Sequence, residues 1–510
     1  METRLERDAA QSLETLKQVE LALAQHRAFG SSAYIRQQLD ICYRRRLDKI
    51  GAALPVAARL SQVLRATDAD HRNQIIGDTV LRCAVQHALR QVVTGLPYGL
   101  PLAQCGALFQ ATLEHIAQGK PGGPLLTGFA QAHSLGSEPH QAWIWNEEHA
   151  DDVFGRAFRD VMAHNYGAPL CSPSAEELSM LARGAQLLKD LLPVLSASAL
   201  QHVQLIGIFP RVGIWNGKAS SSQFRVNGTI FLNRELLGHP WWVAEHLLHE
   251  SLHQKLYDFR HGHTLLEPDY ARPEAPRVCS LWNAPDASQP DAAPSNYWDA
   301  HRTIAAFHVY VHLALLCAMA EAAPELEAIY GPLHGAYTMT GRRRAIDRAR
   351  YLGEQLQQQS WGEMGAAGQR MVAWLMSVLD VLDPVPRPAG STTHLLVDLY
   401  QRQTKKLDRF LQRGTADGTL AAQLRQRIDA EIAGTRTILA RLASSVPLER
   451  FDGALAQCGE VDCHVPRIRK LISDTLLDLP VMPPSQALDE IVKDMVRHSS
   501  AHLSALGVLA

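Results

Sequence analysis

The segment between residues 203 and 233 constrains the fold most, because its residue pattern is β-like and differs from the helical pattern around it. Val203–Ile208 is a short β-like run, and within 223–233 the pair Asn227-Gly228 stands between two alternating segments. Asn-Gly in this setting is the strongest short-range signal for a β-hairpin. The sequence therefore predicts a small antiparallel β-sheet directly before a helix that begins near Pro240, where the missing N–H of proline does no harm.

Most of the remaining chain has helical periodicity. A capping signal at Ser172-Pro173-Ser174 predicts a helix over 175–192, and further helices are expected over about 298–322 and 341–359. The sequence has no internal repeat. These observations predict a mainly α protein with a small antiparallel β-sheet, of the α+β class, rather than a double-stranded β-helix.

Composition and charge narrow the class of protein. The chain has 510 residues, 46% of them hydrophobic and 20% charged, with a formal net charge of -2. These values are ordinary for a soluble globular protein and give no broad basic surface for nucleic acid. The first residues lack the apolar core of a signal peptide, and no stretch reaches the roughly 18 apolar residues that cross a bilayer. Because the 8 cysteines are scattered, a disulfide framework is not indicated. We therefore expect a cytoplasmic protein that binds neither nucleic acid nor membrane.

The helix that begins near Pro240 contains the motif HExxH, formed by His249, Glu250 and His253. Histidines four residues apart on a helix leave the same face one turn apart, which is the geometry of two nitrogen ligands on one metal ion. Glu250 projects nearby and can reach a metal-bound water. The sequence therefore predicts a catalytic divalent metal on this helix.

The known peptidase extensions of this motif are missing. Leu256 and Phe259 stand where HExxHxxGxxH requires glycine and histidine. A glutamate-type zinc peptidase takes its third ligand from a downstream helix, where Glu321, Glu325 and Glu327 are available without a companion motif.

Histidines on the helix expected over 298–322 are better candidates for the third ligand. His301, His308 and His312 share one face at spacings of seven and four. We favour His308, the central one, with His312 as the alternate and His301 third. A single histidine on an apolar helix is usually a core residue, but three aligned histidines downstream of HExxH favour a ligand role.

These residues carry a resemblance to a known family. His239–Asp258, the segment Ser280-Leu-Trp282-Asn, and the stretch from Arg302 through His308-Val-Tyr310 resemble the HExxH-motif peptide-modification proteins found with ribosomal-peptide modification clusters. The resemblance spans roughly residues 70 to 380. Some members of that family are iron(II)- and α-ketoglutarate-dependent hydroxylases that act at β-carbons of amino-acid residues, with a fold distinct from the double-stranded β-helix.

The resemblance implies a ligand set and cofactors. His249 and His253 match the iron-binding pair, and His308 matches the third ligand. The implied reaction uses Fe(II), α-ketoglutarate and O2 on an amino acid that is free, carrier-bound or within a peptide, in natural-product biosynthesis. The far carboxylate of α-ketoglutarate needs a cation, and an arginine offers a bidentate fork. Our candidates are Arg348 and Arg302, then Arg344, although an ion-paired solvated face also explains the arginines around 342–350.

Two other functions stay open. In a Zn(II)-dependent hydrolase of the HExxH class, Glu250 would be the general base, whereas in the hydroxylase it would orient a ligand or a metal-bound water. The third possibility is a non-catalytic helical scaffold with a structural metal. Asn227, Trp215 and Trp282 are candidates for the pocket lining, although core packing also explains the two tryptophans. We expect an N-terminal helical segment over 1–65, the metal-binding catalytic domain over 66–385, and a C-terminal helical bundle over 390–510.

Overall fold

The computed structural model describes residues 4–119, 133–136, 141–283, 296–333, 340–386, 392–412, 418–441, 448–458, 461–477 and 486–505. The chain is mainly helical and divides into two compact units. The first unit consists of Met1–Glu267, Ala305–Ile346 and Met364–Leu382, and the second of Pro268–Ile304, Asp347–Glu363 and Asp383–Ala510. These units divide the chain differently from the three consecutive segments expected from the sequence.

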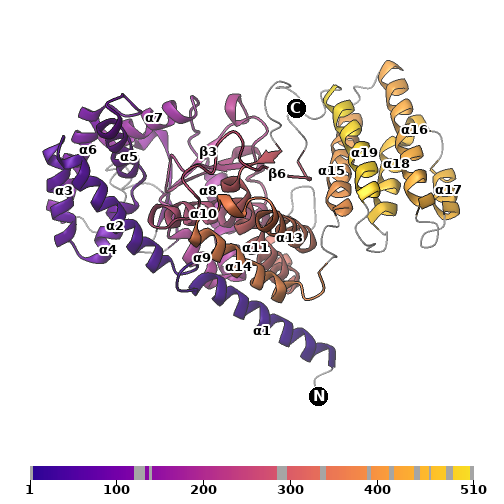
Figure 1. Cartoon of the computed structure of the whole chain (residues 1–510), viewed down its shortest axis with the longest axis horizontal. Helices are drawn as coiled ribbons and strands as arrows, with labels where there is room; N and C mark the ends of the chain where they lie inside the picture. Colours follow the sequence, from indigo (N-terminus) through magenta and orange to yellow (C-terminus); the bar gives the residue numbers. More distant parts are fainter. Residues whose placement is uncertain are drawn as a thin grey trace. The chain divides into compact units, whose positions relative to one another are not determined.

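The first unit contains the sheet and most of the helices that the structure describes (Figure 1). Its α-helices are α1 (Arg4–Gln25), α2 (Ser32–Gly51), α3 (Pro55–Ala66), α4 (Ala69–Gly77), α5 (Thr79–Thr94), α6 (Leu102–Ala117), α7 (Val153–Asn165), α8 (Ala175–Leu191), α9 (Pro193–Leu200), α10 (Pro240–Gly262), most of α11 (Ala300–Glu321), α12 (Glu327–Tyr330) and α14 (Ala366–Leu382). Short 3-10 helices occur at η2 (Glu147–His149), η3 (Gly213–Trp215), η4 (Arg234–Leu236) and η5 (Pro324–Leu326).

The sheet of this unit is mixed, so the expectation of an antiparallel sheet was wrong. Its described strands are β1 (Ser134–Leu135), β2 (Ala142–Ile144), β3 (Leu205–Phe209), β4 (Ser220–Ser222) and β5 (Thr229–Asn233), in the order β1-β2-β3-β5-β4. β2, β3 and β5 are parallel, and β1 and β4 run antiparallel to their neighbours. After β3 the chain passes to the far edge as β4 and returns as β5 between them. This route makes β5 parallel to β3.

A hairpin does precede the motif helix, but its turn differs from the predicted one. β4 pairs with β5 in the register Ser221↔Phe231, and the connection runs over residues 223–228 instead of the two residues Asn227-Gly228. Gly228 has φ +86°, which a residue with a side chain rarely adopts. The Nδ2 atom of Asn227 lies 2.7 Å from Nε2 of His261 in α10. Asn227-Gly228 therefore ends the loop and anchors it to the helix.

Helix α10 is the central helix of the first unit and packs on α8, α2, α9, β4 and β5. Gln254, fully buried, ties it to the start of β5, since its Nε2 donates to Thr229 O (2.8 Å) and its Oε1 accepts from Gly228 N (2.7 Å). α8 begins with the predicted cap, where Ser174 and Glu177 form a capping box. The helix expected over 175–192 is thereby confirmed, and those expected over 298–322 and 341–359 are confirmed as α11 and α13 (Arg342–Gln358).

Gly184 lets α8 approach α10 closely. A Cβ atom at this position would lie 2.3 Å from Cγ1 of Val243. We expect Gly184→Ala to lower the free energy of unfolding by about 1–3 kcal/mol, because overpacking outweighs the helix propensity of alanine. Gly106→Ala in α6 is the control, since its Cβ would meet only ordinary contacts at 3.6 and 3.9 Å, and we expect it to be neutral or stabilising. Urea unfolding followed by circular dichroism tests this pair, and equal effects would contradict the close approach.

The N-terminal helices belong to the core of the first unit. α1 packs on α9 and α14, and α2 packs on α10 and α5. Side chains of α2, α3 and α5 join one buried cluster with residues of β3 and β5, including Leu39, Leu60, Val85 and Phe231. The segment 1–65 thus supports the motif helix directly.

The second unit is mostly a helical bundle. Its α-helices are most of α13, α15 (Thr393–Gln412), α16 (Gly418–Arg441), α17 (Leu448–Ala456), α18 (Val461–Leu477) and α19 (Gln486–Ala505). It also contains η6 (Trp361–Glu363) and a two-stranded ribbon of β6 (Val278–Cys279) with β7 (Tyr297–Trp298). α15, α16, α18 and α19 lie side by side (Figure 1) and enclose their own apolar core.

Among the residues that the structure describes, one helix, α11, is long and apolar enough to cross a membrane by length and composition alone. However, 89% of its apolar window is buried inside the protein, as expected for a core helix.

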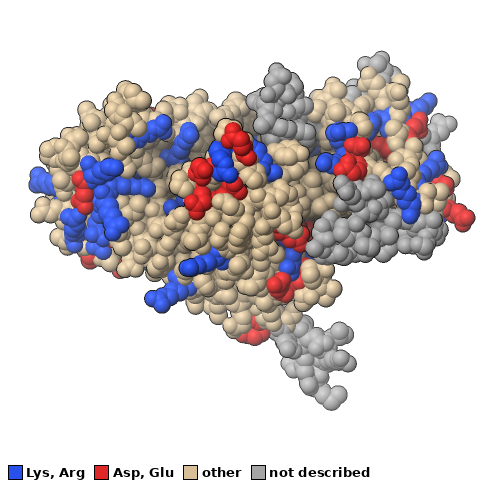
Figure 2. All heavy atoms as spheres, viewed as in Figure 1, with Lys and Arg blue, Asp and Glu red and all other residues tan. Residues whose placement is uncertain are grey.

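Basic and acidic side chains are interspersed over most of the face shown in Figure 2.

Candidate functional site

His249 and His253 stand next to each other on α10, as the HExxH spacing predicts. Their ring centroids are 5.0 Å apart with planes inclined by 69°. The side chain of His249 is 27% exposed, and His253 is half-buried. Both imidazoles therefore lie side by side at a face that solvent reaches, which two ligands of one metal ion require.

Glu250 is held between α10 and the edge strand β4. Its carboxylate is buried, and Oε1 accepts a hydrogen bond of 2.5 Å from Ser220 Oγ. The same oxygen lies 3.9 Å from His249 Nε2. Oε2 is also buried and has no hydrogen-bond partner among the described residues. One oxygen is thus fixed by the strand, and the other is available for a ligand or a water.

Two tyrosines flank this carboxylate. Burial raises the pKa of Tyr166, and the nearby negative charge of Glu250 raises it further. Burial and then Glu250 raise the pKa of Tyr257 in the same way. Both phenols consequently stay neutral near pH 7 and can donate a hydrogen bond.

His308 and His312 are buried on α11. Their ring centroids are 4.4 Å apart, and Nδ1 of His312 lies 2.7 Å from the backbone oxygen of His308. Burial lowers the pKa of His308 well below its ordinary value, and His312, Lys255 and His253 lower it further. Burial also lowers the pKa of His312, to about 3. The Nδ1 atom of His308 has no hydrogen-bond partner in the described structure, so a neutral imidazole with an available nitrogen lies within electrostatic range of His253.

The predicted metal ligands meet only part of what a metal requires. His249 and His253 fit a metal ion, because they are adjacent, half-exposed and accompanied by an unpartnered carboxylate oxygen. Across the described ranges, however, no three side chains of His, Cys, Asp or Glu are grouped closely enough to hold a metal ion. His308 is on the neighbouring helix but does not complete such a group. His301 lies in the second unit, where its ring is 6.2 Å from that of Tyr270.

The three arginines predicted to bind α-ketoglutarate have other contacts. Arg348 pairs with Asp398 at 3.0 Å and stacks on the ring of Trp282. Arg302 lies over the ring of Trp298, and Arg344 donates to the backbone oxygen of Thr340. A carboxylate ligand at Arg348 would have to displace or share Asp398. Arg302 and Arg348 belong to the second unit and Arg344 to the first.

The glutamates considered for a zinc peptidase lie at and after the end of α11, with Glu321 as its last residue, Glu325 in η5 and Glu327 at the start of α12. Glu321 and Glu325 are exposed. Burial raises the pKa of the Cys317 thiol, and the negative charges of Glu245 and Glu321 raise it further. This part of α11 therefore lies near the first turns of α10. Glu245 itself is buried and accepts two hydrogen bonds from Thr340.

The residues predicted to line a pocket serve packing. Trp215 is fully buried and stacks on Tyr166 and Phe209 with ring centroids 4.5 Å apart in each pair. Trp282 is 2% exposed in the core of the second unit. Asn227 is buried against α10, as described above.

Two polar residues near the motif were missed from the sequence. Ser220 belongs to a run of serines that carries no motif, and only its strand pairing places it at Glu250. Lys255 is 1% exposed, and its Nζ donates to Gly30 O (2.5 Å) and Ser198 Oγ (2.8 Å). Burial lowers the pKa of Lys255 to about 7. A lysine is usually exposed, and the residues around Lys255 carry no local signal that predicts its burial.

No protein-family model matches this chain, and no curated protein shows significant similarity to it.

Proposed function

We propose that this chain is a metal-dependent enzyme whose metal ion is held by His249 and His253. The observation that carries the proposal is the buried Oε2 atom of Glu250, which has no hydrogen-bond partner in the described structure and belongs to a carboxylate whose Oε1 lies 3.9 Å from His249 Nε2. Leaving a buried carboxylate oxygen unsatisfied costs about 1–3 kcal/mol or more. Such a cost is typical of positions where a reacting group or a ligand supplies the missing partner.

Within this class, we propose an iron(II)- and α-ketoglutarate-dependent hydroxylase of the HExxH type. Its substrate would be an amino acid, free, carrier-bound or within a peptide, in cytoplasmic natural-product biosynthesis. Two features support it besides the motif. His308, on α11, lies within electrostatic range of His253, and Glu321 and Glu325, which could replace it as a carboxylate ligand, are exposed. When bound, iron with α-ketoglutarate and O2 supplies the chemistry that converts C–H to C–OH.

The residues of this chain would position the reactants. His249 and His253 would hold the ion, and His308 is the candidate for the third ligand. Ser220 fixes one oxygen of Glu250, so the other oxygen can accept a hydrogen bond from a water or substrate group at the site. The phenols of Tyr166 and Tyr257 stay protonated, so they add no negative charge beside the carboxylate of Glu250.

A zinc-dependent hydrolase is the second candidate, because one observation favours it specifically. The edge strand β4 pairs antiparallel with β5, contacts α10 and presents Ser220 to Glu250, an arrangement resembling that of zincins. There Glu250 Oε2 would accept the proton of the attacking water and return it to the leaving group.

Anaerobic reconstitution distinguishes the two candidates. We expect purified chain supplied with iron(II) and then α-ketoglutarate to develop a weak visible charge-transfer band that requires both additions and is absent in His249→Ala. The matched control is His246→Ala, one turn earlier on the same helix, which should keep the band. Tight stoichiometric zinc binding without any band in the presence of iron and α-ketoglutarate would contradict the hydroxylase and favour the hydrolase.

Glu250→Gln gives a second test that separates the roles of the carboxylate. Glutamine keeps an oxygen for Ser220 but cannot accept a proton. We expect metal binding to persist, and hydrolysis of peptide or ester probes to fall about 10²–10⁴-fold if Glu250 is a general base. In the hydroxylase, the iron and α-ketoglutarate band should persist in Glu250→Gln. Equal metal binding by wild type and Glu250→Gln, with neither hydrolysis nor the band in the wild type, would indicate a scaffold with a structural metal.

A further inference from the structure

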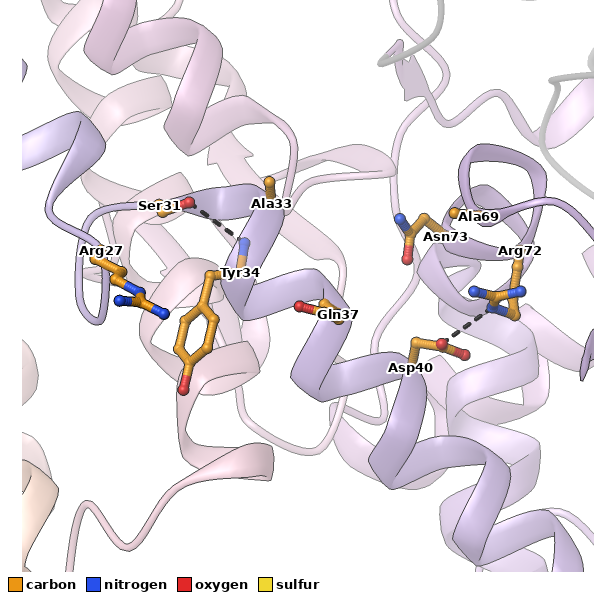
Figure 3. A pocket seen from close by; sticks show the side chains of 9 residues that line it. All are labelled: Arg27, Ser31, Ala33, Tyr34, Gln37, Asp40, Ala69, Arg72 and Asn73. Atoms are coloured by element: carbon orange, nitrogen blue, oxygen red, sulfur yellow. Dashed lines mark hydrogen bonds and ion pairs between the residues drawn. The ribbon is translucent and has the colours of Figure 1, made fainter.

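The first unit has a cavity of about 450 Å³ between the beginning of α2 and helix α4 (Figure 3). This volume is within the range of small-molecule and peptide-side-chain sites. The cavity is separate from the HExxH residues, none of which line it. It is lined by Arg27, Ser31, Ala33, Tyr34, Gln37, Asp40, Ala69, Arg72 and Asn73.

The walls of the cavity are fixed by contacts behind them. Ser31 caps α2, since its Oγ accepts from Tyr34 N at 3.3 Å. The ring of Tyr34 is stacked 5.6 Å from that of His263. On the other side, Arg72 Nε donates to Asp40 Oδ2 at 3.0 Å, and Arg72 Nη1 donates to Thr67 O at 2.7 Å. Ser31, Tyr34, Asp40 and Arg72 are therefore held in place before a ligand binds, whereas the exposed side chains of Arg27 and Gln37 would be ordered by it.

The charge of the cavity is positive. Asp40 is its single lining carboxylate, and it is already bonded to Arg72 and to Arg44, whose Nε lies 2.8 Å from Oδ1. Arg27, in contrast, makes no side-chain hydrogen bond or ion pair with any described residue, and its guanidinium points toward Tyr34 (Figure 3). Helices α2 to α4 carry more Arg and Lys than Asp and Glu, and basic side chains gather there in Figure 2. The unpaired cation thus lies in a basic region.

The neutral groups suit an amide-bearing ligand. Gln37 and Asn73 belong to different helices and line the cavity between Arg27 and Arg72 (Figure 3). Each side-chain amide offers both a donor and an acceptor, and neither makes a hydrogen bond to a described residue. This pairing of amides with a nearby guanidinium matches a carboxylate carried on a peptide-like backbone.

We propose that this cavity binds a carboxylate group attached to an amide-bearing backbone, with Arg27 as the carboxylate partner and Gln37 and Asn73 as the backbone partners. Two sources share this chemistry: a small N-acylated acidic amino acid and an acidic peptide segment. The site is independent of the metal, because its residues belong to α2, α4 and the loop before α2.

Calorimetric titration of the metal-free full chain at low salt tests the proposal. The probes are N-acetylglutamate and the capped peptide acetyl-Ala-Glu-Ala-Glu-Ala-amide, with the corresponding lysine peptide as the negative probe. We expect saturable binding of one or both acidic probes and none of the lysine peptide. Tighter binding of the peptide would identify a peptide segment as the ligand, and binding of N-acetylglutamate alone would identify a small molecule.

The matched variants are Arg27→Gln and Arg59→Gln. Both arginines are exposed in the first unit, but Arg59 on α3 does not line the cavity. We expect Arg27→Gln to weaken binding about tenfold or more, as for the loss of one charge-assisted pair, and Arg59→Gln to leave it unchanged. Absence of binding by both acidic probes, or equal binding by the two variants, would overturn the proposal. Neither result depends on metal binding, so failure here and failure of the proposed function remain distinguishable.

Discussion

Asp258→Ala is expected to lower the free energy of unfolding of the first unit by about 3–5 kcal/mol, the cost of leaving a buried charge without its partner. Asp258 is fully buried, and Arg82, 3% exposed, donates to it from Nη1 at 2.8 Å. His202 Nδ1 lies 2.7 Å from the other carboxylate oxygen. The pair joins α5 to α10, so its loss affects the helix that carries the motif.

The control for this substitution is Asp48→Ala. Asp48 pairs with Arg65 at 2.5 Å, but the two side chains are 43% and 51% exposed. Exposed pairs contribute roughly 0–1 kcal/mol. Urea unfolding of both variants tests the difference, and a loss in Asp258→Ala no larger than in Asp48→Ala would contradict the buried network.

The same network predicts a dependence on pH. Burial alone would raise the pKa of Asp258, but Arg82 and the hydrogen bond from His202 hold it below its ordinary value. A carboxyl with a depressed folded-state pKa stabilises the fold above its unfolded pKa of about 3.9, and the contribution is lost as pH falls through the folded value. We therefore expect the gap between wild type and Asp258→Ala to be constant from pH 6 to 7 and to shrink only below about pH 4. A gap that shrinks already near neutral pH would contradict this assignment.

Glu431→Ala is expected to destabilise the C-terminal bundle by a similar amount, about 3–5 kcal/mol. Glu431 is fully buried and receives two hydrogen bonds from Arg469, from Nε at 2.9 Å and from Nη2 at 2.6 Å. Tyr400 donates to it at 2.6 Å. Removing the carboxylate leaves the buried guanidinium of Arg469 without a counter-charge at the junction of α15, α16 and α18.

Asp452→Ala is the matched control in the same bundle, because its pair with Arg436 is exposed by 42% and 48%. We expect it to change stability by less than about 1 kcal/mol. Thermal unfolding followed by circular dichroism would show a lower-temperature transition in Glu431→Ala alone. Coincident transitions in wild type and Glu431→Ala would mean that the buried pair does not stabilise the bundle.

Local signals predicted several parts of this fold well. The cap at Ser174 and the apolar spacing after it place α8 to within one residue of its end, and α11 and α13 follow the same reasoning. The four-residue spacing of His249 and His253 places both rings on one face of α10. These features depend on neighbours within one or two helical turns, which a sequence displays directly.

Long-range features could not be predicted in the same way. β2 and β3 pair in parallel although α7, α8 and α9 lie between them in the chain, and β2 is too short to show a period of two. Ser220 reaches Glu250 only through the register of β4 with β5. The distance between His308 and the motif depends on how α11 packs against α10, which no spacing within either helix determines.

Titration of divalent metal into the chain tests the central proposal most directly. Wild type and the control His246→Ala should each bind one ion per chain, and His249→Ala and His253→Ala should each bind at least about 10-fold more weakly, since a lost metal ligand costs no less than a lost outer-shell partner. If the wild type binds no ion, or if both histidine variants bind as the wild type does, the assignment of His249 and His253 as metal ligands is wrong.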